Sequence, residues 1–179
     1  MTRVAAGEVE LYEELYSRHF GGVSRFAMRV FGMSPTDAEE ATQTVFMKIY
    51  GAAGRYNVRA KFTSYLYKVA RNECLKIVVK KRPVAAGSAG SEETGASEGD
   101  DSGRDLEGRE LGECIAKVMG MLSLEQRTAV QLRDSEGLSY DEIARSMDAT
   151  VAAVNTWIHR GRRRFMERFR ELYGDVYPM

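Results

Sequence analysis

The sequence predicts an all-α protein of two small helical domains joined by a flexible acidic linker. Apolar residues recur at helical spacing in both halves of the chain, and strand-like alternation is absent. Between the halves, residues 87–105 read "GSAGSEETGASEGDDSGRD", with no apolar side chain larger than that of Ala. Such a stretch cannot bury enough surface to offset the entropy of ordering. We therefore place the first domain at 1–83, the linker at 84–108 and the second domain at 109–179.

The neutral total charge conceals an uneven distribution. The 179 residues hold 26 basic and 26 acidic side chains. Counted by segment, the net charge is +6 over residues 1–82, −7 over residues 83–113 and +1 over residues 114–179. The acidic linker therefore hides a basic first domain, whose charge suits a nucleic-acid partner.

Cysteine usage and hydropathy favour a cytoplasmic protein. Cys74 and Cys114 lie in no CxxC pattern and near no paired histidine, so we expect free thiols in a reducing compartment. No apolar run approaches the roughly 20 residues of a membrane span, and the N-terminus lacks the apolar segment of a signal peptide. We expect neither a cofactor nor a bound metal.

The first two helices are expected over residues 9–31 and from Pro35 onward. In the first of them, Gly21 and Gly22 interrupt the pattern, and we expect a bend or a junction between two helices there. In the second, Ser34 is placed to cap the helix and the proline fits its first turn.

A third helix is expected over residues 61–81, after a glycine-containing loop over 51–60. At about 100° per residue, one face of this helix gathers cations, an aromatic ring and an amide. The face comprises Lys61, Tyr65, Lys68, Asn72 and Lys76, and the loop adds Tyr56, Asn57 and Arg59. Cations can contact a phosphate backbone and aromatic rings can stack on bases, so this face suits single-stranded DNA. A solvated basic helix with its tyrosine half in the core would explain the pattern equally well.

The second domain carries two helix-start signatures. Ser123 and Gln126 have the spacing of a capping box, and so do Ser139 and Glu142. The helix that follows the first signature is expected to stop at Gly137. Two short helices joined by a tight turn then follow, within "GLSYDEIARSMDATVAAVNTWIHRGRRRF". Their spacing is that of a helix-turn-helix, whose second helix lies in the major groove of DNA.

The second helix of this motif is capped by Thr150 and amphipathic. Its buried stripe is expected to be Val151, Val154, Ile158 and Phe165. Its opposite face combines small side chains, which allow close approach to a groove, with groups that bond base edges and phosphates. This face comprises Ala152, Ala153, Asn155, Thr156, His159, Arg160, Arg162 and Arg163. An ordinary helical hairpin with solvated arginines is the alternative, and Trp157 suits packing at least as well as DNA contact.

Two stretches of this chain resemble the extracytoplasmic-function (ECF) sigma factors, small two-domain bacterial transcription initiation factors. The first is "DAEEATQTVFMKIY" followed by "RYNVRAKFTSYLYKVARNECLKI", and the second is "LSLEQRTAVQLRDSEGLSYDEIARSMDATVAAVNTWIHRGRRRF". Together they cover most of residues 10–170. The resemblance implies a sigma domain 2 that binds the minus-ten element and the polymerase clamp. It also implies a sigma domain 4 that binds the minus-thirty-five element and the polymerase flap.

The resemblance also implies roles for individual residues. Asn72 and the preceding loop would capture a minus-ten base turned out of the stack, where an amide can both donate and accept. The helix that starts at Pro35 would bind core polymerase through Asp37, Glu40, Gln43, Thr44 and Met47. An anti-sigma factor is an expected partner. The linker would run through the polymerase, either as an acidic mimic of RNA or as a mere spacer.

A few positions depart from the family pattern. Tyr65 stands where the family usually has Trp, and Asp148 stands where the turn usually has Gly. Asn155 and Trp157 replace the frequent Lys and Arg. Because Asp tolerates a positive φ, we expect the turn to survive. The changes on the second helix bear on which promoter sequence is bound and leave the fold expectation unchanged.

We therefore expect a promoter-specificity subunit of RNA polymerase that recognises both promoter elements and promotes melting. The main alternative is a helix-turn-helix regulator that works without polymerase, which would have no use for the Asn72 face. An enzyme is the third class. The chain has no GxSxG, no phosphate-binding glycine loop and no HExxH, and its two histidines, His19 and His159, are far apart in sequence.

Overall fold

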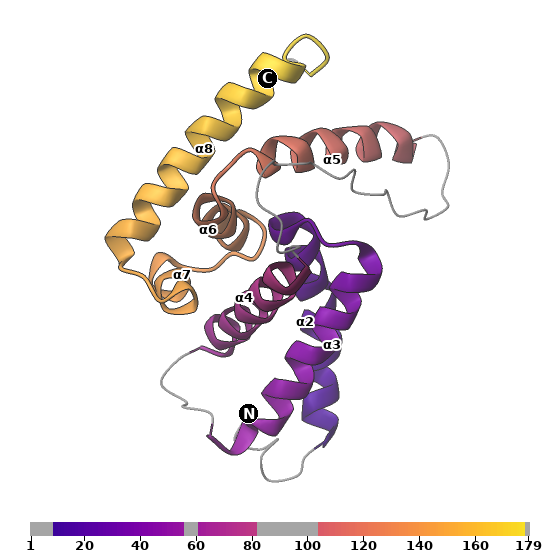
Figure 1. Ribbon diagram of the computed structural model, residues 1–179, viewed down its shortest axis with the longest axis vertical. Coiled ribbons are helices and arrows are strands. Elements are labelled where there is room, and N and C mark those ends of the chain that lie inside the picture. Colours follow the sequence, from indigo (N-terminus) through magenta and orange to yellow (C-terminus); the bar gives the residue numbers. More distant parts are fainter. Residues whose placement is uncertain (1–8, 56–60, 82–103, 178–179) are drawn as a thin grey trace.

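The computed structural model describes residues 9–55, 61–81 and 104–177, and this part of the chain contains helices and no strand (Figure 1). The all-α prediction is therefore confirmed. The elements are α2 (Val9–Phe31), α3 (Pro35–Gly51), the 3-10 helix η1 (Ala53–Arg55), α4 (Phe62–Lys81), α5 (Arg104–Gly120), α6 (Leu124–Asp134), α7 (Tyr140–Met147) and α8 (Val151–Tyr173). The predicted loop residues Tyr56, Asn57 and Arg59 lie outside the described residues, as does the linker up to residue 103. None of the described helices has the length and apolarity to cross a membrane.

Helix α2 runs from Val9 to Phe31 as one element, so Gly21 and Gly22 do not separate two helices. The second glycine serves a close approach between helices. A Cβ atom at Gly22 would stand 3.0 Å from the hydroxyl of Tyr67 and 3.2 Å from a carboxylate oxygen of Glu136. These two side chains fill the space that a side chain at this position would need, which accounts for a mid-helix glycine despite its low helix propensity.

Helix α3 begins as its sequence predicts. The Ser34 hydroxyl accepts a hydrogen bond from the Asp37 backbone N–H at 3.2 Å, and Pro35 occupies the first turn. The apolar side chains of its inner face are buried, namely Ala38, Ala41, Val45 and Ile49. Local capping and periodicity therefore fix this helix.

The helices of the second half confirm both capping boxes, at Ser123 with Gln126 and at Ser139 with Glu142. The turn between α7 and α8 holds Asp148 at a φ of 52°, in the left-handed region, as expected for an aspartate in place of glycine. Thr150 caps α8 by accepting from the Ala153 N–H at 3.2 Å. These caps set where the second helix of the motif starts.

Two expectations about this half need correction. Val151 was expected in the buried stripe of α8, but it is 41% exposed, because its first-turn position puts it at the rim of a cleft beside α4. The linker was expected to reach residue 108, but α5 begins at Arg104. From that residue the composition changes to Arg, Leu and Glu, which are strong helix formers.

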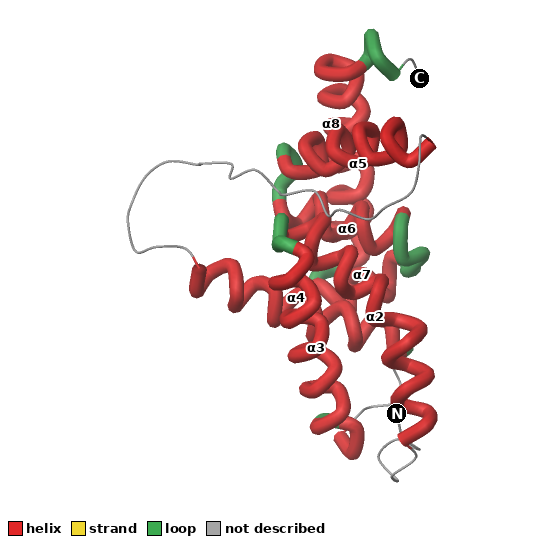
Figure 2. Tube along the Cα trace, turned by 90° about the vertical axis from the view of Figure 1, so that its right-hand side faces the viewer, coloured by secondary structure: helices red, strands yellow, loops and turns green. Residues whose placement is uncertain are grey.

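The two sets of helices pack against each other. α4 lies on α7, and α2 lies on α6, an arrangement on which both views agree (Figure 1, Figure 2). One hydrophobic cluster contains Phe26 and Leu66 from the first set together with Leu132, Ile143 and Ile158 from the second. The described parts of the two predicted domains therefore share a core.

Candidate nucleic-acid interface

The predicted minus-thirty-five face of α8 is exposed. Val154, Ile158 and Phe169 point into the core. Of the eight predicted contact residues, Ala153 is half-buried, and the other seven are exposed: Ala152, Asn155, Thr156, His159, Arg160, Arg162 and Arg163. Trp157 packs against the core cluster, as its place beside the buried stripe suggested. The structure thus leaves the face that would enter a groove uncovered.

Gly161 fixes how closely α8 lies on α6, and sequence reasoning missed it. A Cβ atom there would stand 2.9 Å from a methyl carbon of Val130 and 3.3 Å from Cβ of Gln126. Its place among the apolar positions of the helix, three residues after Ile158, could have predicted that it is buried. Close contact with α6 anchors α8 at the point where its exposed face becomes arginine-rich.

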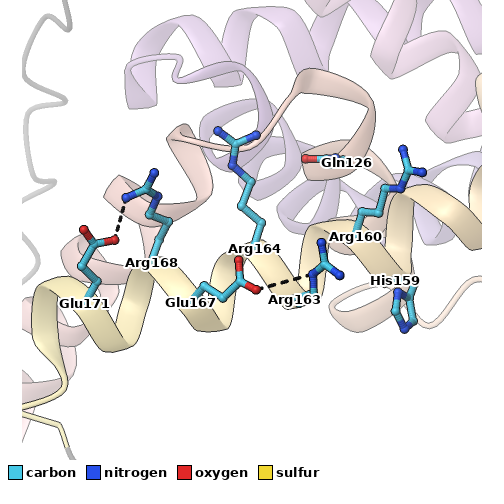
Figure 3. A pocket seen from close by; sticks show the side chains of 8 residues that line it. All are labelled: Gln126, His159, Arg160, Arg163, Arg164, Glu167, Arg168 and Glu171. Carbon is cyan, nitrogen blue, oxygen red and sulfur yellow. Dashed lines mark hydrogen bonds and ion pairs between the residues drawn. The ribbon is translucent and has the colours of Figure 1, made fainter.

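A groove of about 740 Å³ runs beside this arginine-rich part of α8 (Figure 3). Its lining includes Arg160, Arg164 and Arg168, which recur every four residues and so share one edge of the helix. Two neighbouring ion pairs partly balance the charge, Arg163 with Glu167 at 3.5 Å and Arg168 with Glu171 at 2.6 Å. Arg164 and Arg168 were not among the predicted contacts, although their spacing from Arg160 could have found them.

Arg162 is a predicted contact that bonds a residue of α6. Its guanidinium donates to both carboxylate oxygens of Asp134, with the Nε bond at 3.2 Å. This hydrogen bonding raises the pKa of Arg162. The residue therefore fastens α8 to the end of α6, and it does not line the groove beside Arg160.

The predicted minus-ten face of α4 is partly covered by α7. Lys61 forms an ion pair with Glu142 at 3.1 Å, and Lys68 forms one with Asp148 at 2.5 Å. Tyr65 is half-buried against the core cluster. Together with α7, Tyr65 and Lys68 line a cleft of about 510 Å³.

The far end of the same face lies beyond α7. Asn72 is half-buried, and Lys76 donates to Glu73 at 2.9 Å. Glu73 also forms an ion pair with Lys48 of α3. Burial alone would raise the pKa of Glu73, but hydrogen bonds from both lysines outweigh it and lower that pKa. Glu73 was not singled out at the sequence level, because its partner Lys48 lies on another helix and the pairing follows from the tertiary fold.

The predicted polymerase face of α3 is open. Glu40, Gln43 and Met47 are exposed, and Asp37 and Thr44 are half-buried. Met47 is 73% exposed, which is unusual for a methionine in a helix that buries its other face. A hydrogen bond from Lys81, reinforced by Ser34, lowers the pKa of Asp37. The face combines acidic, amide and apolar groups.

Cys74 is a buried free thiol on α4. Burial raises the pKa of Cys74 to about 12, which makes its thiol unreactive. Within the described ranges, no group of three or more His, Cys, Asp or Glu side chains is placed to hold a metal ion. The arrangement can bind and position a polyanion through cations, amides and an aromatic ring.

Two family descriptions match this chain. Residues 15–83 match "Sigma-70 region 2", and residues 112–165 match "Sigma-70, region 4". The first match contains α3 and α4, and the second contains the helix-turn-helix. The predicted faces of α3 and α4 therefore fall in the first match, and the predicted face of α8 falls in the second.

Individual relatives agree with this assignment. The chain is 29% identical to the ECF RNA polymerase sigma-E factor of Escherichia coli strain K12 over 168 residues, covering 89% of this chain and 87% of the relative. The fold of this chain is similar to that of CnrH, which was solved with the cytosolic domain of CnrY. The TM-score is 0.71 and the identity 21%, over 95% of this chain and 94% of that one. RpoE of Bartonella quintana, solved with the anti-sigma factor NepR, gives a TM-score of 0.67 and 18% identity over 90% and 97%. The chain belongs to the extracytoplasmic-function family of RNA polymerase sigma factors.

Proposed function

We propose that this protein is a promoter-specificity subunit in which α8 binds the minus-thirty-five duplex and α4 holds the minus-ten non-template strand. The observation that carries the proposal is the presence of two chemically different surfaces in one chain. One is an exposed amide and arginine face on the second helix of a helix-turn-helix. The other is a lysine, tyrosine and asparagine face on α4. Duplex and single-stranded DNA call for these two kinds of surface.

Duplex binding falls to the first three turns of α8. A helix of 23 residues is about 34 Å long, whereas the major groove is only about 12 Å wide. The early residues Asn155, Thr156 and His159 are therefore the ones that can reach base edges. Arg160 and Arg163, farther along, suit the phosphates at the groove wall.

Strand capture falls to α4 and the loop before it. Lys61 and Lys68 offer positive charge to the backbone, and Tyr65 offers a ring on which a base can stack, worth about 1 to 3 kcal/mol. Asn72 can bond the Watson–Crick edge of a base turned out of the stack. Tyr56, Asn57, Arg59 and Lys76 complete the proposed minus-ten set.

Core polymerase contact falls to the open face of α3, formed by Asp37, Glu40, Gln43, Thr44 and Met47. Exposed apolar and acidic groups on one helix are a suitable surface for a protein partner. The catalytic chemistry belongs to the polymerase, and this chain contributes differential binding of the open strand, so we propose no enzyme activity for it. Because its targets are polymerase and promoter DNA, we propose that it acts in the cytoplasm.

An anti-sigma factor is a further proposed partner. The related fold of RpoE was solved with the anti-sigma factor NepR. A partner of this kind would regulate when the protein reaches core polymerase.

The helix-turn-helix regulator working without polymerase gains no support, because both matched family descriptions are sigma regions.

Reconstituted transcription tests the proposal. Core polymerase with the wild-type protein should initiate at specific sites on fragmented genomic DNA, and transcript sequencing would reveal both promoter elements. Asn72→Ala should impair open-complex formation while leaving affinity for core polymerase nearly unchanged. Loss of core affinity would instead make Asn72 structural. Tight duplex binding without any initiation would favour the polymerase-independent regulator.

A further inference from the structure

The first turns of α8, which are the ones that can enter a major groove, carry no charged side chain. After the cap at Thr150, residues 151–159 read VAAVNTWIH, without Lys, Arg, Asp or Glu. At 1.5 Å per residue, Ala152 and His159 lie about 10 Å apart along the helix axis, and the groove is about 12 Å wide. Arginine or lysine is the commonest reader of guanine, and a carboxylate is a usual partner of cytosine. Neither kind of group occurs in this stretch.

The arginines that follow are placed for other partners. Their places are given by two ion pairs and by the groove shown in Figure 3: Arg162 bonds Asp134, Arg163 pairs with Glu167 at 3.5 Å, and Arg160 lines the groove. Base reading by the first turns of α8 therefore falls to groups other than a guanidinium.

Asn155 is the amide among these groups, and it is exposed. In the major groove adenine offers an acceptor at N7 and a donor at N6, so a side-chain amide can bond both atoms at once. Guanine offers two acceptors, N7 and O6, on the same edge. One of the two amide groups, the carbonyl, would then face a second acceptor. The amide of Asn155 therefore favours adenine over guanine.

Ala152 and Thr156 add methyl groups beside this amide. They are four residues apart, so they are neighbours on the helix surface, and both are exposed. The Thr156 hydroxyl donates to the Ala152 carbonyl at 2.9 Å, which uses its proton within the helix. The donor of Thr156 is thus occupied, and its methyl remains for DNA. Thymine carries the methyl group that such apolar side chains contact in the major groove.

We infer that α8 selects an adenine through Asn155 and a thymine on the neighbouring base pair through the methyl groups of Ala152 and Thr156. This inference rests on the proposed function, because it takes α8 as the duplex-binding helix. His159 offers an imidazole that can reach N7 of either purine, so it does not make this choice. The minus-thirty-five element of this protein therefore contains an A·T step where the first turns of α8 enter the groove.

Selection from randomised duplexes tests the base choice without polymerase. The full-length protein would be mixed with duplexes carrying about ten randomised base pairs, one helical turn, and the bound fraction sequenced. The wild type should enrich an adenine with an adjoining thymine. Asn155→Arg should replace that adenine by guanine, and Asn155→Ala should remove the preference. Ser17→Arg is the control, because it adds the same charge at an exposed position of α2, and it should keep the adenine.

Base analogues in the enriched duplex test each contact by fluorescence anisotropy. Replacing the adenine by 7-deazaadenine removes N7 and should weaken wild-type binding roughly fivefold, the lower end for a bidentate contact. The same replacement should leave the binding of Asn155→Ala unchanged. Replacing the thymine by uracil removes one methyl group and should weaken binding roughly fourfold. Thr156→Ser lacks the opposing methyl group and should reduce that difference.

The inference is overturned if the wild type enriches guanine at this position. It is also overturned if the adenine persists after Asn155→Ala, which would indicate readout through groove shape, or if uracil binds as tightly as thymine. A library without any enriched sequence would overturn base reading by α8 altogether. Transcription with core polymerase tests the proposed function separately. If specific initiation continues while Asn155→Arg leaves the selected bases unchanged, the promoter role stands and this base assignment fails.

Discussion

Tyr67 on α4 donates a hydrogen bond to the carboxylate of Glu136, a residue 69 positions away in the loop between α6 and α7. Burial, followed by this hydrogen bond, raises the pKa of Tyr67. The hydroxyl therefore stays protonated at any physiological pH and remains a donor. This side-chain bond thus joins the two regions that the family comparisons match separately.

Replacing Tyr67 by Phe should lower the free energy of unfolding by about 1.5 to 3 kcal/mol, the usual loss for a hydrogen bond to a charged group. The loss should be read from urea denaturation of the full-length chain. Tyr12→Phe is a matched control, because its hydroxyl donates to the Phe46 carbonyl within the first domain. If the scattering profile expands for Tyr67→Phe and stays compact for Tyr12→Phe, the bond joins the halves. Identical profiles would show that it only stabilises α4.

Arg160 and Arg164 should contribute to duplex binding mainly through phosphates. Each change to Gln should weaken binding of a minus-thirty-five duplex and reduce the slope of log affinity against log salt by about 0.9. The measurement is a salt titration of fluorescence anisotropy. Arg18→Gln is the control, since Arg18 pairs with Glu14 on α2. An unchanged slope for Arg164→Gln would remove that residue from the interface and confine DNA contact to the earlier turns of α8.

Gly161→Ala should destabilise the second domain by about 1 to 3 kcal/mol, because its Cβ would stand 2.9 Å from Val130 in a packed interface. Gly112→Ala on α5 is the control, since nothing lies within 4 Å of its Cβ position. That control should be neutral or slightly stabilising through helix propensity. Thermal unfolding of the two variants gives the comparison, and equal melting temperatures would show that α8 can shift away from α6 without cost.

Local signals in the sequence predicted most of the helices, but they could not predict the contacts between helices. Three helix caps could be predicted because each side chain bonds a backbone N–H only three residues later. These caps are Ser34, Ser139 and Thr150. Gly22 looked like a break because the groups that need its space, on α4 and after α6, are distant in the chain. Lys61 and Lys68 were predicted on one face for the same local reason, whereas the carboxylates opposite them could come only from the tertiary fold.

Glu73 should make the stability of the first domain depend on pH. Its side chain is 10% exposed and forms ion pairs with Lys48 and Lys76, and these partners hold its pKa below the ordinary value of 4.5. A lowered folded-state pKa contributes stability that is present above pH 4.5 and is lost as the pH falls through the folded-state value. Glu73→Gln should therefore cost about 1 to 2 kcal/mol at pH 7 and progressively less below pH 4.5. Urea denaturation at pH 7 and at pH 3 measures this difference. Glu14→Gln is the control, because Glu14 belongs to an exposed ion pair. If the cost stays constant down to pH 3, Glu73→Gln destabilises the domain through poorer packing of the amide. The ion pairs with the two lysines would then contribute no stability.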